Sequence, residues 1–296
     1  MIGHWHTQTC SLCAPELSSR ETMGVTDMVR QYTQVLTIAG SDPGGGAGIQ
    51  ADLKTFAALG CYGLSVITAL TAQSTTGVSA IEPVPSRFIG TQIDAVLKDM
   101  KPRAIKIGML YSVEQLEVVA QTVKKYPVPH VVVDPVMASQ GGTSLLAPEA
   151  LPAFRELMMP LATLVTPNLP EASALLDTQI HTLEEIKAGA RRLASYGGNS
   201  ILVKGGHMGG EQSNDVLFLG PESRFVCFEE KRIQTLNDHG TGCTLSSAIA
   251  SFLARGEPVE GAVRAGKAFL TEALRAGAAY KIGKGRGPVH HFYRFW

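Results

Sequence analysis

The sequence predicts an α/β fold in which a mainly parallel β-sheet is covered by helices on both faces. Short apolar runs alternate with stretches of helical spacing along most of the 296 residues. Several of these runs, such as HVVV at 130–133, contain no charged residue, which is typical of strands buried on both faces. The chain is also long enough to bury one large core. Strands that alternate with helices of this length form parallel sheets, so we expect one α/β domain.

The composition is that of a globular protein without a dominant charge. Apolar residues make up 45% of the chain and charged residues 18%, and 26 Lys and Arg balance 26 Asp and Glu. We therefore expect neither nucleic acid nor a membrane as a partner, and no apolar stretch reaches the roughly 18 residues of a membrane helix. Five cysteines in so long a chain favour a reducing compartment. These features indicate a cytoplasmic enzyme.

Residues 1–33 differ from the rest because they show no sustained period. We expect a flexible N-terminal extension followed by one domain over 34–296. Cys10 and Cys13, with His4 and His6 nearby, have the spacing of half a zinc site, but no second pair at standard spacing completes it. A tail without a metal is the favoured interpretation.

The first half of the domain follows the alternation closely. We predict a strand at 35–39, a glycine-rich loop at 40–48, a helix over 49–59 that stops before Gly60, a strand at 62–70, and a hairpin or edge element over 72–84. Further elements follow in order: a helix from a Ser86 cap to Met100, a strand at 104–110, a helix to Lys125 opened by a Ser112–Gln115 capping box, and a strand ending at Asp134.

The second half continues in the same way, with consecutive strands before two long helices. The expected elements are a strand at 161–168, a helix from Pro170 to Leu176, a helix from Leu183 to Tyr196, strands at 200–206, 215–220 and 223–236, and helices over 244–255 and 259–279. Ligands of such sheets bind beyond the carboxyl ends of the strands. Polar and glycine residues follow several predicted strands, and these positions are Gly40, Asp134, Asn168, Lys204 and the loop at Gly240.

The stretch NDHGTGCTLSSAIA at 237–250 indicates an anion site. Gly240 and Gly242 let the backbone turn so that N–H groups converge at the positive end of the following helix. A thiol at that position, Cys243, should ionise more easily than a free one. The alternative is an ordinary loop in which Cys243 is a small buried apolar residue.

Two common nucleotide signatures do not explain this anion site. No stretch matches the Walker pattern G-x-x-x-x-G-K-[ST]. Gly46-x-Gly48-x-x-Ala51 matches the loose dinucleotide fingerprint, but the next carboxylate after Asp52 is Glu82, too far for the ribose contact. These glycines are better explained as a place where a small substrate approaches the backbone.

The chain from Val35 to Trp296 resembles the ribokinase superfamily, and within it the hydroxymethylpyrimidine/phosphomethylpyrimidine kinases of thiamine biosynthesis. The matching segments, in family order, are AGSDPGGGAGIQADLKTFAALG, YGLSVITALTAQ, KIGML, VVVDPVM, TPNLPEA, VKGGH, HGTGCTLS and GKGRGPVHH. The resemblance implies a three-layer α/β/α sandwich with a mostly parallel central sheet, ATP as phosphoryl donor and Mg²⁺ as cofactor. It also implies two successive phosphorylations, of 4-amino-5-hydroxymethyl-2-methylpyrimidine and then of its monophosphate.

The resemblance also implies roles around the transferring phosphate. Gly240, Thr241 and Gly242 would offer backbone N–H groups to it. Cys243 stands where most of the superfamily has an aspartate base, so a helix-start thiolate is the expected proton acceptor.

Four more residues are expected on the nucleotide side of the site. Asn168 and Glu171 match the superfamily's N-x-x-E element and would hold Mg²⁺ through water near the nucleotide phosphates. Lys204 would contact a nucleotide phosphate, and Asp134 would orient metal or phosphate. The alternatives are helix capping by Asn168 and a solvated surface lysine at position 204.

Five residues are expected on the substrate side. Gln73 would bind the aminopyrimidine edge, because a side-chain amide offers a donor and an acceptor together. Asp52 and the backbone at Gly40 and Val136 would add polar contacts, and Met109 would form an apolar wall. Asp52 could equally be a charge on a helix surface.

Three rival functions stay open at this point. Pyridoxal kinase of the same fold is the nearest, and Gln73 with Met109 favours the pyrimidine over it. A thiol acyltransferase or hydrolase would use Cys243 as nucleophile with His207 or His239 as base. A regulator that binds nucleotide without turnover is the third, disfavoured by the intact glycine loop. We expect a homodimer.

Overall fold

The computed structural model describes residues 30–139, 141–207 and 212–296. Residues 32–296 form one compact unit, so the fold begins two residues before the predicted domain start. The Cys10–Cys13 pair and its neighbouring histidines lie outside the described residues, as does most of the predicted N-terminal extension.

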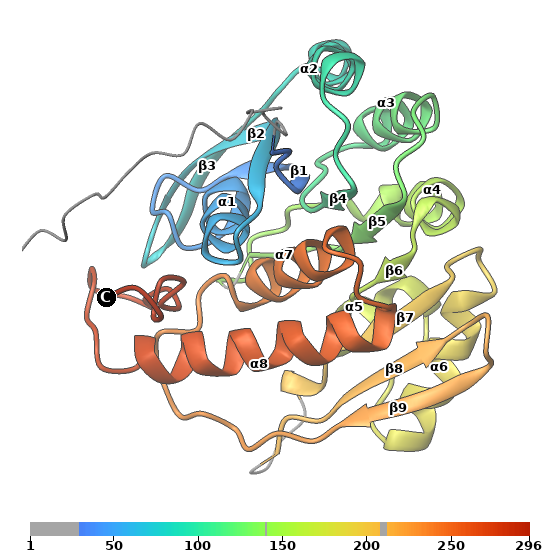
Figure 1. The fold of residues 1–296 in the computed structure, drawn as a ribbon. Helices are drawn as coiled ribbons and strands as arrows, with labels where there is room; N and C mark the ends of the chain where they lie inside the picture. The colour runs from blue at the N-terminus through green and yellow to red at the C-terminus, as the bar shows by residue number, and fades with distance from the viewer. Residues whose placement is uncertain (1–29, 140, 208–211) are drawn as a thin grey trace, which may run out of the picture. The chain divides into compact units, whose positions relative to one another are not determined.

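A single sheet runs through this unit, and its central strands are parallel (Figure 1). Nine strands of the described chain join in the order β3-β2-β1-β4-β5-β6-β7-β8-β9. Their bounds are β1 Gln34–Ser41, β2 Tyr62–Ser74, β3 Gly77–Pro83, β4 Ala104–Ile107, β5 His130–Val133, β6 Leu164–Val165, β7 Ser200–Val203, β8 Asp215–Leu219 and β9 Arg224–Phe228. From β2 to β7 every pairing is parallel, whereas β3, β8 and β9 pair antiparallel at the two edges.

The helices form a layer on each face of the sheet. Their bounds are α1 Gly48–Ala58, α2 Ser86–Asp99, α3 Val113–Val123, α4 Leu151–Leu157, α5 Leu169–Leu176, α6 Leu183–Ala194, α7 Thr241–Ala254 and α8 Val259–Gly277, with short 3₁₀ turns η1 Pro148–Ala150, η2 Met159–Leu161 and η3 Gly205–His207. One apolar cluster joins the sheet to α2–α6, and a second joins it to α1, α7 and α8. The predicted three-layer α/β/α sandwich is confirmed.

Alternation along the strands explains why both layers are needed. In β5, Val131 and Val133 belong to the cluster under α2–α6, and Val132 between them belongs to the cluster under α7 and α8. All three are at least 94% buried. Successive side chains of a strand point to opposite faces, so an uninterrupted valine run requires apolar cover on both.

The strand order reverses beside β1. The chain goes from β1 to β2 on one side and then returns to place β4 on the other side of β1. Crevices at the carboxyl ends of parallel strands form at such a reversal. The residues at the ends of β1 and β4 therefore open into the site described below.

Two predicted helix starts differ in detail from the structure. Ser86 is the first residue of α2 and not its cap, since Pro85 precedes the helix without a side-chain capping bond. Ser112 does cap α3, accepting the Gln115 N–H, but the Gln115 side chain does not return to Ser112. Its amide accepts the Tyr111 N–H and donates to carbonyls of neighbouring segments, so tertiary contacts replace the second half of the capping box.

The structure has more regular secondary structure in two segments than the sequence pattern predicted. Strand β2 continues to Ser74 and forms a hairpin with β3, which settles the choice left open for 72–84. Helix α4 was not expected, because its seven residues are too few for a clear period. Gly60 takes the left-handed conformation just past α1, with φ of +74°, as predicted.

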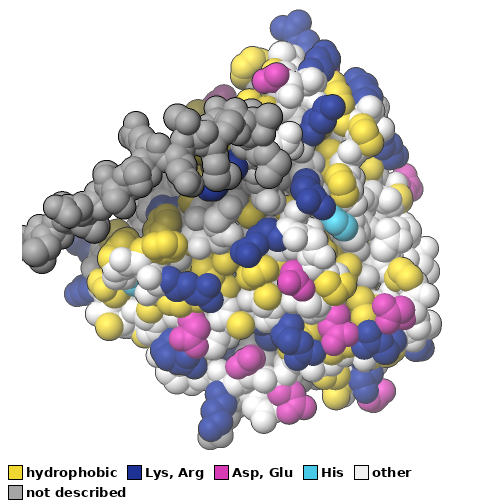
Figure 2. Space-filling model, viewed as in Figure 1, with side chains coloured by type: hydrophobic (Ala, Val, Ile, Leu, Met, Phe, Trp, Pro, Cys, Tyr) yellow, Lys and Arg dark blue, Asp and Glu magenta, His cyan; other side chains and the backbone are white. Residues whose placement is uncertain are grey.

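The surface carries charges of both signs, as the equal numbers of basic and acidic residues predict. In Figure 2, basic and acidic side chains are interspersed over the face formed by α8 and the β8–β9 hairpin. No helix in the described part of the chain is long and apolar enough to cross a membrane.

Candidate active site

The loop after β1 closes on itself through one carboxylate. Asp42 accepts backbone N–H groups of Gly44, Gly46 and Ala47 at 2.8–3.0 Å. The loop then returns so tightly that a Cβ on Gly48 would lie 2.4 Å from the Gly40 carbonyl oxygen, and Gly48 has φ of +57°. Only glycine fits there, and this is the physical meaning of the GSDPGGGAG stretch.

A second loop, before α7, packs directly against the first. Gly240 precedes the helix with φ of +79°, and a Cβ on it would lie 1.8 Å from the Gly46 carbonyl oxygen. The Thr241 N–H donates to the Asp238 carbonyl. Of the three predicted N–H donors, Thr241 is thus already engaged within the loop. Helix geometry leaves the N–H groups of Gly242 and Cys243, in the first turn of α7, without intrahelical acceptors.

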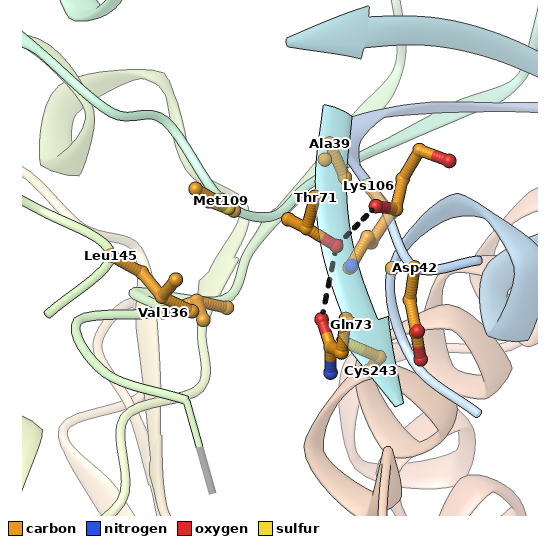
Figure 3. A pocket seen from close by; sticks show the side chains of 12 residues that line it. Ala39, Asp42, Thr71, Gln73, Lys106, Met109, Val136, Leu145 and Cys243 are labelled. Carbon is orange, nitrogen blue, oxygen red and sulfur yellow. Dashed lines mark hydrogen bonds between the residues drawn. The ribbon is translucent and has the colours of Figure 1, made fainter. Parts of the chain in front are cut away.

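A cavity opens where β1, β2 and β4 end beside this helix start (Figure 3). It is lined by Ala39, Gly40, Ser41, Asp42, Gly48, Thr71, Gln73, Lys106, Met109, Val136, Leu145 and Cys243. Figure 3 shows an apolar side, formed by Met109, Val136 and Leu145, that faces the polar Thr71 and Gln73 on the other side. An apolar enclosure with few polar groups is typical of small-molecule sites.

Four of the five predicted substrate residues lie in this cavity: Gly40, Gln73, Met109 and Val136. Gly40 lets Met109 approach, since a Cβ there would lie 2.9 Å from the Met109 sulfur. Val136 donates its N–H to the Asp134 carbonyl, so the backbone group that it can still offer is its carbonyl.

Asp52, the fifth, does not line the cavity. It is fully buried on α1, where it accepts hydrogen bonds from Thr37 at 2.6 Å, Ser247 at 2.6 Å and Lys106 at 3.0 Å. The expectation of direct substrate contact is therefore not supported, and the alternative of a surface charge is wrong. Asp52 instead holds Lys106, which does line the cavity.

Lys106 is the feature that the sequence reasoning missed. Its side chain is fully buried, and its ammonium group has three protons of which Asp52 accepts one. Burial alone would lower the pKa of Lys106, but Asp52 and then Cys243 raise it above the ordinary value. A lysine inside the otherwise apolar run AIKIGML was the available signal, because a buried charge needs a partner or a role.

The prediction of an easily ionised thiol is wrong for this structure. Burial raises the pKa of Cys243 to about 11, and the carboxylates of Asp52 and Asp134 act in the same direction. Lys106 and the Gly48 N–H oppose this rise but do not overcome it. Residues 240–243 at the helix start are only partly exposed, so loss of hydration opposes the effect of the positive helix end on the thiol.

A second ion pair lies on the other side of the helix start. Lys204 donates to Asp134 at 2.8 Å, and Asp134 also accepts from the hydroxyls of Thr166 and Ser246. A Cβ on Gly242 would lie 3.4 Å from the Lys204 ammonium and 3.6 Å from Asp134. The Lys204 side chain is 14% exposed, so the alternative of a solvated surface lysine is wrong.

Asn168 and Glu171 form a complete capping box at the start of α5. Asn168 accepts the Glu171 N–H at 2.8 Å, and Glu171 accepts the Asn168 N–H at 2.7 Å. The capping alternative is thus present, and it leaves the other carboxylate oxygen of Glu171 available. Burial raises the pKa of Glu171 to about 7, while Lys204, at 3.9 Å, opposes that rise.

The fit of a magnesium ion can be tested on these groups. In the part of the chain that is described, no group of three or more His, Cys, Asp or Glu residues could hold a metal ion. One oxygen of Asp134 accepts from Lys204 and Thr166, so this carboxylate first of all holds Lys204 in place. The other oxygen lies 3.2 Å from the Ser246 hydroxyl, whose single proton the Gly242 and Cys243 carbonyls also attract. Glu171 fits a contact made through water, which is how Mg²⁺ is commonly held beside nucleotide phosphates.

The geometry does not support acyl transfer through Cys243. The charged groups that act on this thiol are Lys106, Asp52 and Asp134. His239 directs Nε2 to Asp42 at 2.9 Å, and the side chain of His207 lies outside the described residues. A nucleophilic thiol needs a base within hydrogen-bond reach, and neither histidine is shown in that position.

The fold and this crevice define the class of protein: a ribokinase-like α/β kinase. The model of the family described as phosphomethylpyrimidine kinase matches residues 42–290. A hydroxymethylpyrimidine/phosphomethylpyrimidine kinase of Rhizobium meliloti is 49% identical over 88% of this chain and 97% of its own length. The corresponding kinase of Escherichia coli is 46% identical over 88% and 98%. The chain therefore belongs to the phosphomethylpyrimidine kinase family, as the resemblance implied.

Solved structures agree with this assignment. A phosphomethylpyrimidine kinase from Clostridium difficile is 45% identical, with a TM-score of 0.72 over 81% of this chain and 99% of its own. A Bacillus subtilis pyridoxal kinase, solved as an ADP complex, is 35% identical, with a TM-score of 0.82 over 90% and 100%. The backbone is thus shared with pyridoxal kinases, while sequence identity is greater with the pyrimidine kinases.

Proposed function

We propose that this chain transfers a phosphoryl group from ATP to the hydroxymethyl group of 4-amino-5-hydroxymethyl-2-methylpyrimidine, and then a second one to the resulting monophosphate. The observation that carries the proposal is the cavity in which the Gln73 amide faces an apolar wall of Met109, Val136 and Leu145, and which Cys243 also lines (Figure 3). A flat aminopyrimidine offers apolar faces and a donor–acceptor edge, which such a cavity complements. Family membership supports the same substrate class.

Transfer of a phosphoryl group needs positioning and charge neutralisation more than covalent chemistry. On the substrate side, the N–H groups of Gly242 and Cys243, which have no acceptors within α7, would bind the anion, and Lys106 supplies a fixed positive charge. Cys243 is the candidate acceptor of the hydroxyl proton. With its pKa raised to about 11, only a small fraction is thiolate at neutral pH, so turnover through this base rises with pH.

On the nucleotide side, Lys204 is the candidate contact to the phosphates, oriented by Asp134. Magnesium, when bound, supplies charge neutralisation at the nucleotide phosphates. Glu171 would hold it through water, and Asn168 orients Glu171 through the capping box. The role of Asp134 is accordingly to fix Lys204.

Product analysis tests the proposal directly. The purified chain is incubated with ATP, Mg²⁺ and hydroxymethylpyrimidine, and the products are identified by mass spectrometry. We expect the monophosphate first and the diphosphate after it. Accumulation of the monophosphate alone would contradict the second step, and absence of both products would contradict the proposal.

Pyridoxal phosphorylation is the second candidate, because pyridoxal kinases share the fold at a TM-score of 0.82. The same assay with pyridoxal at equal concentration decides between the two. A higher kcat/KM for pyridoxal would overturn the pyrimidine assignment. We also propose a homodimer in the cytoplasm, for which sedimentation velocity is the test of assembly.

A further inference from the structure

We propose that His239, acting through Gln73, is a positioning residue that sets substrate specificity: it turns the Gln73 carbonyl toward ligands that offer an amino donor beside a ring-nitrogen acceptor. This inference rests on the proposed function. It assigns His239 a role away from phosphoryl transfer, since its ring contacts the loop after β1 and the Gln73 amide.

The His239 ring cannot turn away from this position. Its backbone N–H donates to the Gly287 carbonyl at 3.0 Å, which ties it to the C-terminal segment. The ring packs against Gly46, where a Cβ would come within 2.3 Å of the ring carbon Cδ2. The side chain is 13% exposed. Backbone and packing together therefore hold Nε2 at one place beside the cavity.

The ring nitrogen Nε2 carries a proton and donates it. Nε2 lies 2.9 Å from the Oδ2 oxygen of Asp42. Burial would raise the pKa of Asp42, but the bond from His239 and the N–H groups of Ala47 and Gly44 lower it below the ordinary value. Asp42 is therefore a carboxylate, which only accepts hydrogen bonds, so the nitrogen facing it must be the donor.

Proton counting then fixes the orientation of the Gln73 amide. Thr71 Oγ1 lies 2.9 Å from the Ser41 carbonyl and 3.2 Å from one end of the amide. The single Thr71 proton goes to the carbonyl, so the amide end beside Thr71 must donate and is the NH₂ group. The other end lies 3.3 Å from His239 Nε2, whose single proton points mainly to Asp42. A protonated ring nitrogen cannot accept an N–H, so the end that fits there is the oxygen, which can share that proton.

The opposite orientation fails at both ends. The structure has Oε1 toward Thr71, as Figure 3 shows, and Nε2 toward His239. Once the Thr71 proton goes to Ser41 and the His239 proton to Asp42, this orientation leaves two acceptors 3.2 Å apart and two donors 3.3 Å apart. A half-turn of the amide group, which leaves its shape unchanged, removes both conflicts, and the His239 proton is then shared between Asp42 and the amide oxygen. A neighbouring β-bulge between Ala72 and Gln73 interrupts the regular pairing with β3 at this point.

The locked amide explains discrimination between similar rings. It presents an acceptor on the His239 side and a donor on the Thr71 side, which matches an amino group next to a ring nitrogen. A ring with an oxygen acceptor in place of the amino group would meet the carbonyl, and two acceptors would be left facing each other. Without His239 only the Thr71 contact orients the amide, and the amide can turn when the Thr71 hydroxyl redirects its proton from Ser41 to it. Selectivity should therefore fall by about 10- to 100-fold.

The test compares His239→Leu, His239→Gln, Gln73→Leu and the double variant His239→Leu/Gln73→Leu, each assayed with hydroxymethylpyrimidine and with pyridoxal at fixed ATP. We expect His239→Leu to raise the pyrimidine KM about 10-fold or more, with kcat changed less than about 3-fold. Glutamine, whose side-chain N–H reaches a similar place, should restore most of the affinity. His181→Leu, on the exposed start of α6, is the matched control and should behave as wild type.

The double variant separates positioning from a structural role. If His239 acts through Gln73, its removal adds nothing once Gln73 is leucine, so the two effects are not additive. Additive effects, an equal loss of kcat for both substrates, or no rescue by His239→Gln would overturn the inference. Calorimetric binding of hydroxymethylpyrimidine without ATP gives the same comparison independently of turnover. A wild type that binds the pyrimidine but does not phosphorylate it would refute the proposed function and leave the role of His239 to be decided by binding.

Discussion

Two Asp–Lys pairs lie on opposite sides of the start of α7, and they differ in access to solvent. In the pair formed by Lys106 and Asp52 the charged atoms are 3.0 Å apart and both side chains are fully buried. In the pair formed by Lys204 and Asp134 they are 2.8 Å apart, with the side chains 14% and 2% exposed. The first pair adjoins the cavity through Lys106, and the second lies beside Glu171.

The difference indicates a division of labour between the pairs. Lys106 lines the cavity, but its side chain is fully buried and bonded to Asp52, so we expect it to keep this partner and to act as a fixed positive charge beside Cys243. A partly accessible lysine can reorient toward a phosphate while Asp134 keeps its bonds from Thr166 and Ser246. We therefore propose that similar chemistry serves as scaffold on one side and as a ligand contact on the other.

The strongest test of this division removes the sealed lysine. Lys106→Met leaves Asp52 charged and buried without its cation, and such a loss costs about 3–5 kcal/mol of unfolding free energy. Urea denaturation followed by circular dichroism measures it. Lys187→Met, which breaks an exposed pair with Glu184, is the control and should leave the midpoint unchanged. A Lys106→Met protein as stable as wild type would refute the view of Lys106 as scaffold.

Removal of the Cys243 thiol tests whether this group, which lies beside the positive charge of Lys106, is the catalytic base. Cys243→Ala should fold normally and lose about 10²–10⁴-fold in kcat if the thiol is the base. Because the pKa of Cys243 is raised to about 11, the wild-type rate should climb with pH between about 7 and 9 as the thiolate fraction grows, and this climb should disappear in the variant. Unaltered turnover, or an unchanged pH profile, would rule out the base assignment.

The accessible pair should respond in activity more than in stability. Lys204→Met is expected to lower kcat/KM for ATP about 10- to 100-fold, as loss of a charge-assisted contact worth about 1.5–3 kcal/mol would do. Its unfolding free energy should fall less than that of Lys106→Met, because Asp134 keeps two hydroxyl donors. Steady-state kinetics and the same denaturation assay give both numbers. The reverse order of stability loss would contradict the comparison between the pairs.

The smallest expected effect is on the pH dependence of stability. It concerns His291, which shares a hydrogen bond of 3.0 Å with Thr244 of α7. Burial lowers the pKa of His291 to about 3, so the folded protein keeps it neutral. The unfolded chain binds a proton near pH 6.5, so stability is lost as the pH falls from about 6.5 towards 3. His291→Gln cannot titrate and should lose about 2 kcal/mol less than wild type between pH 6.5 and 5. Equal losses in urea denaturation at the two pH values would refute this.

Most of the fold could be predicted because its signals are local. Apolar runs such as that of β5, the glycine after α1 and the period of α8 depend on residues close in sequence. The errors have a different origin. The Gln115 side chain prefers carbonyls of Thr68 and Val84 to the capping box, and these partners are 47 and 31 residues away. The spacing of residues in the sequence does not indicate such long-range contacts.

The site was predictable in its residues and less so in its electrostatics. Gln73, Met109 and Cys243 were found through the family resemblance, and the cavity brings them together. The pKa of Cys243 was misjudged because the expectation used the helix start and could not include burial. Lys106 was missed because its partner, Asp52, lies 54 positions earlier on another element. Burial and pairing are properties of the folded chain.

The two loops that meet at Gly240 and Gly46 also have a consequence for synthesis. His239 and Asp42, which bond across this junction, are 197 positions apart. The ribosome completes the first loop long before the second one leaves the exit tunnel, and Gly287 and the Thr75–Arg286 bond follow later still. The cavity is thus among the last parts of the molecule to be assembled. A nascent or truncated chain could fold much of its sheet while remaining unable to hold a substrate.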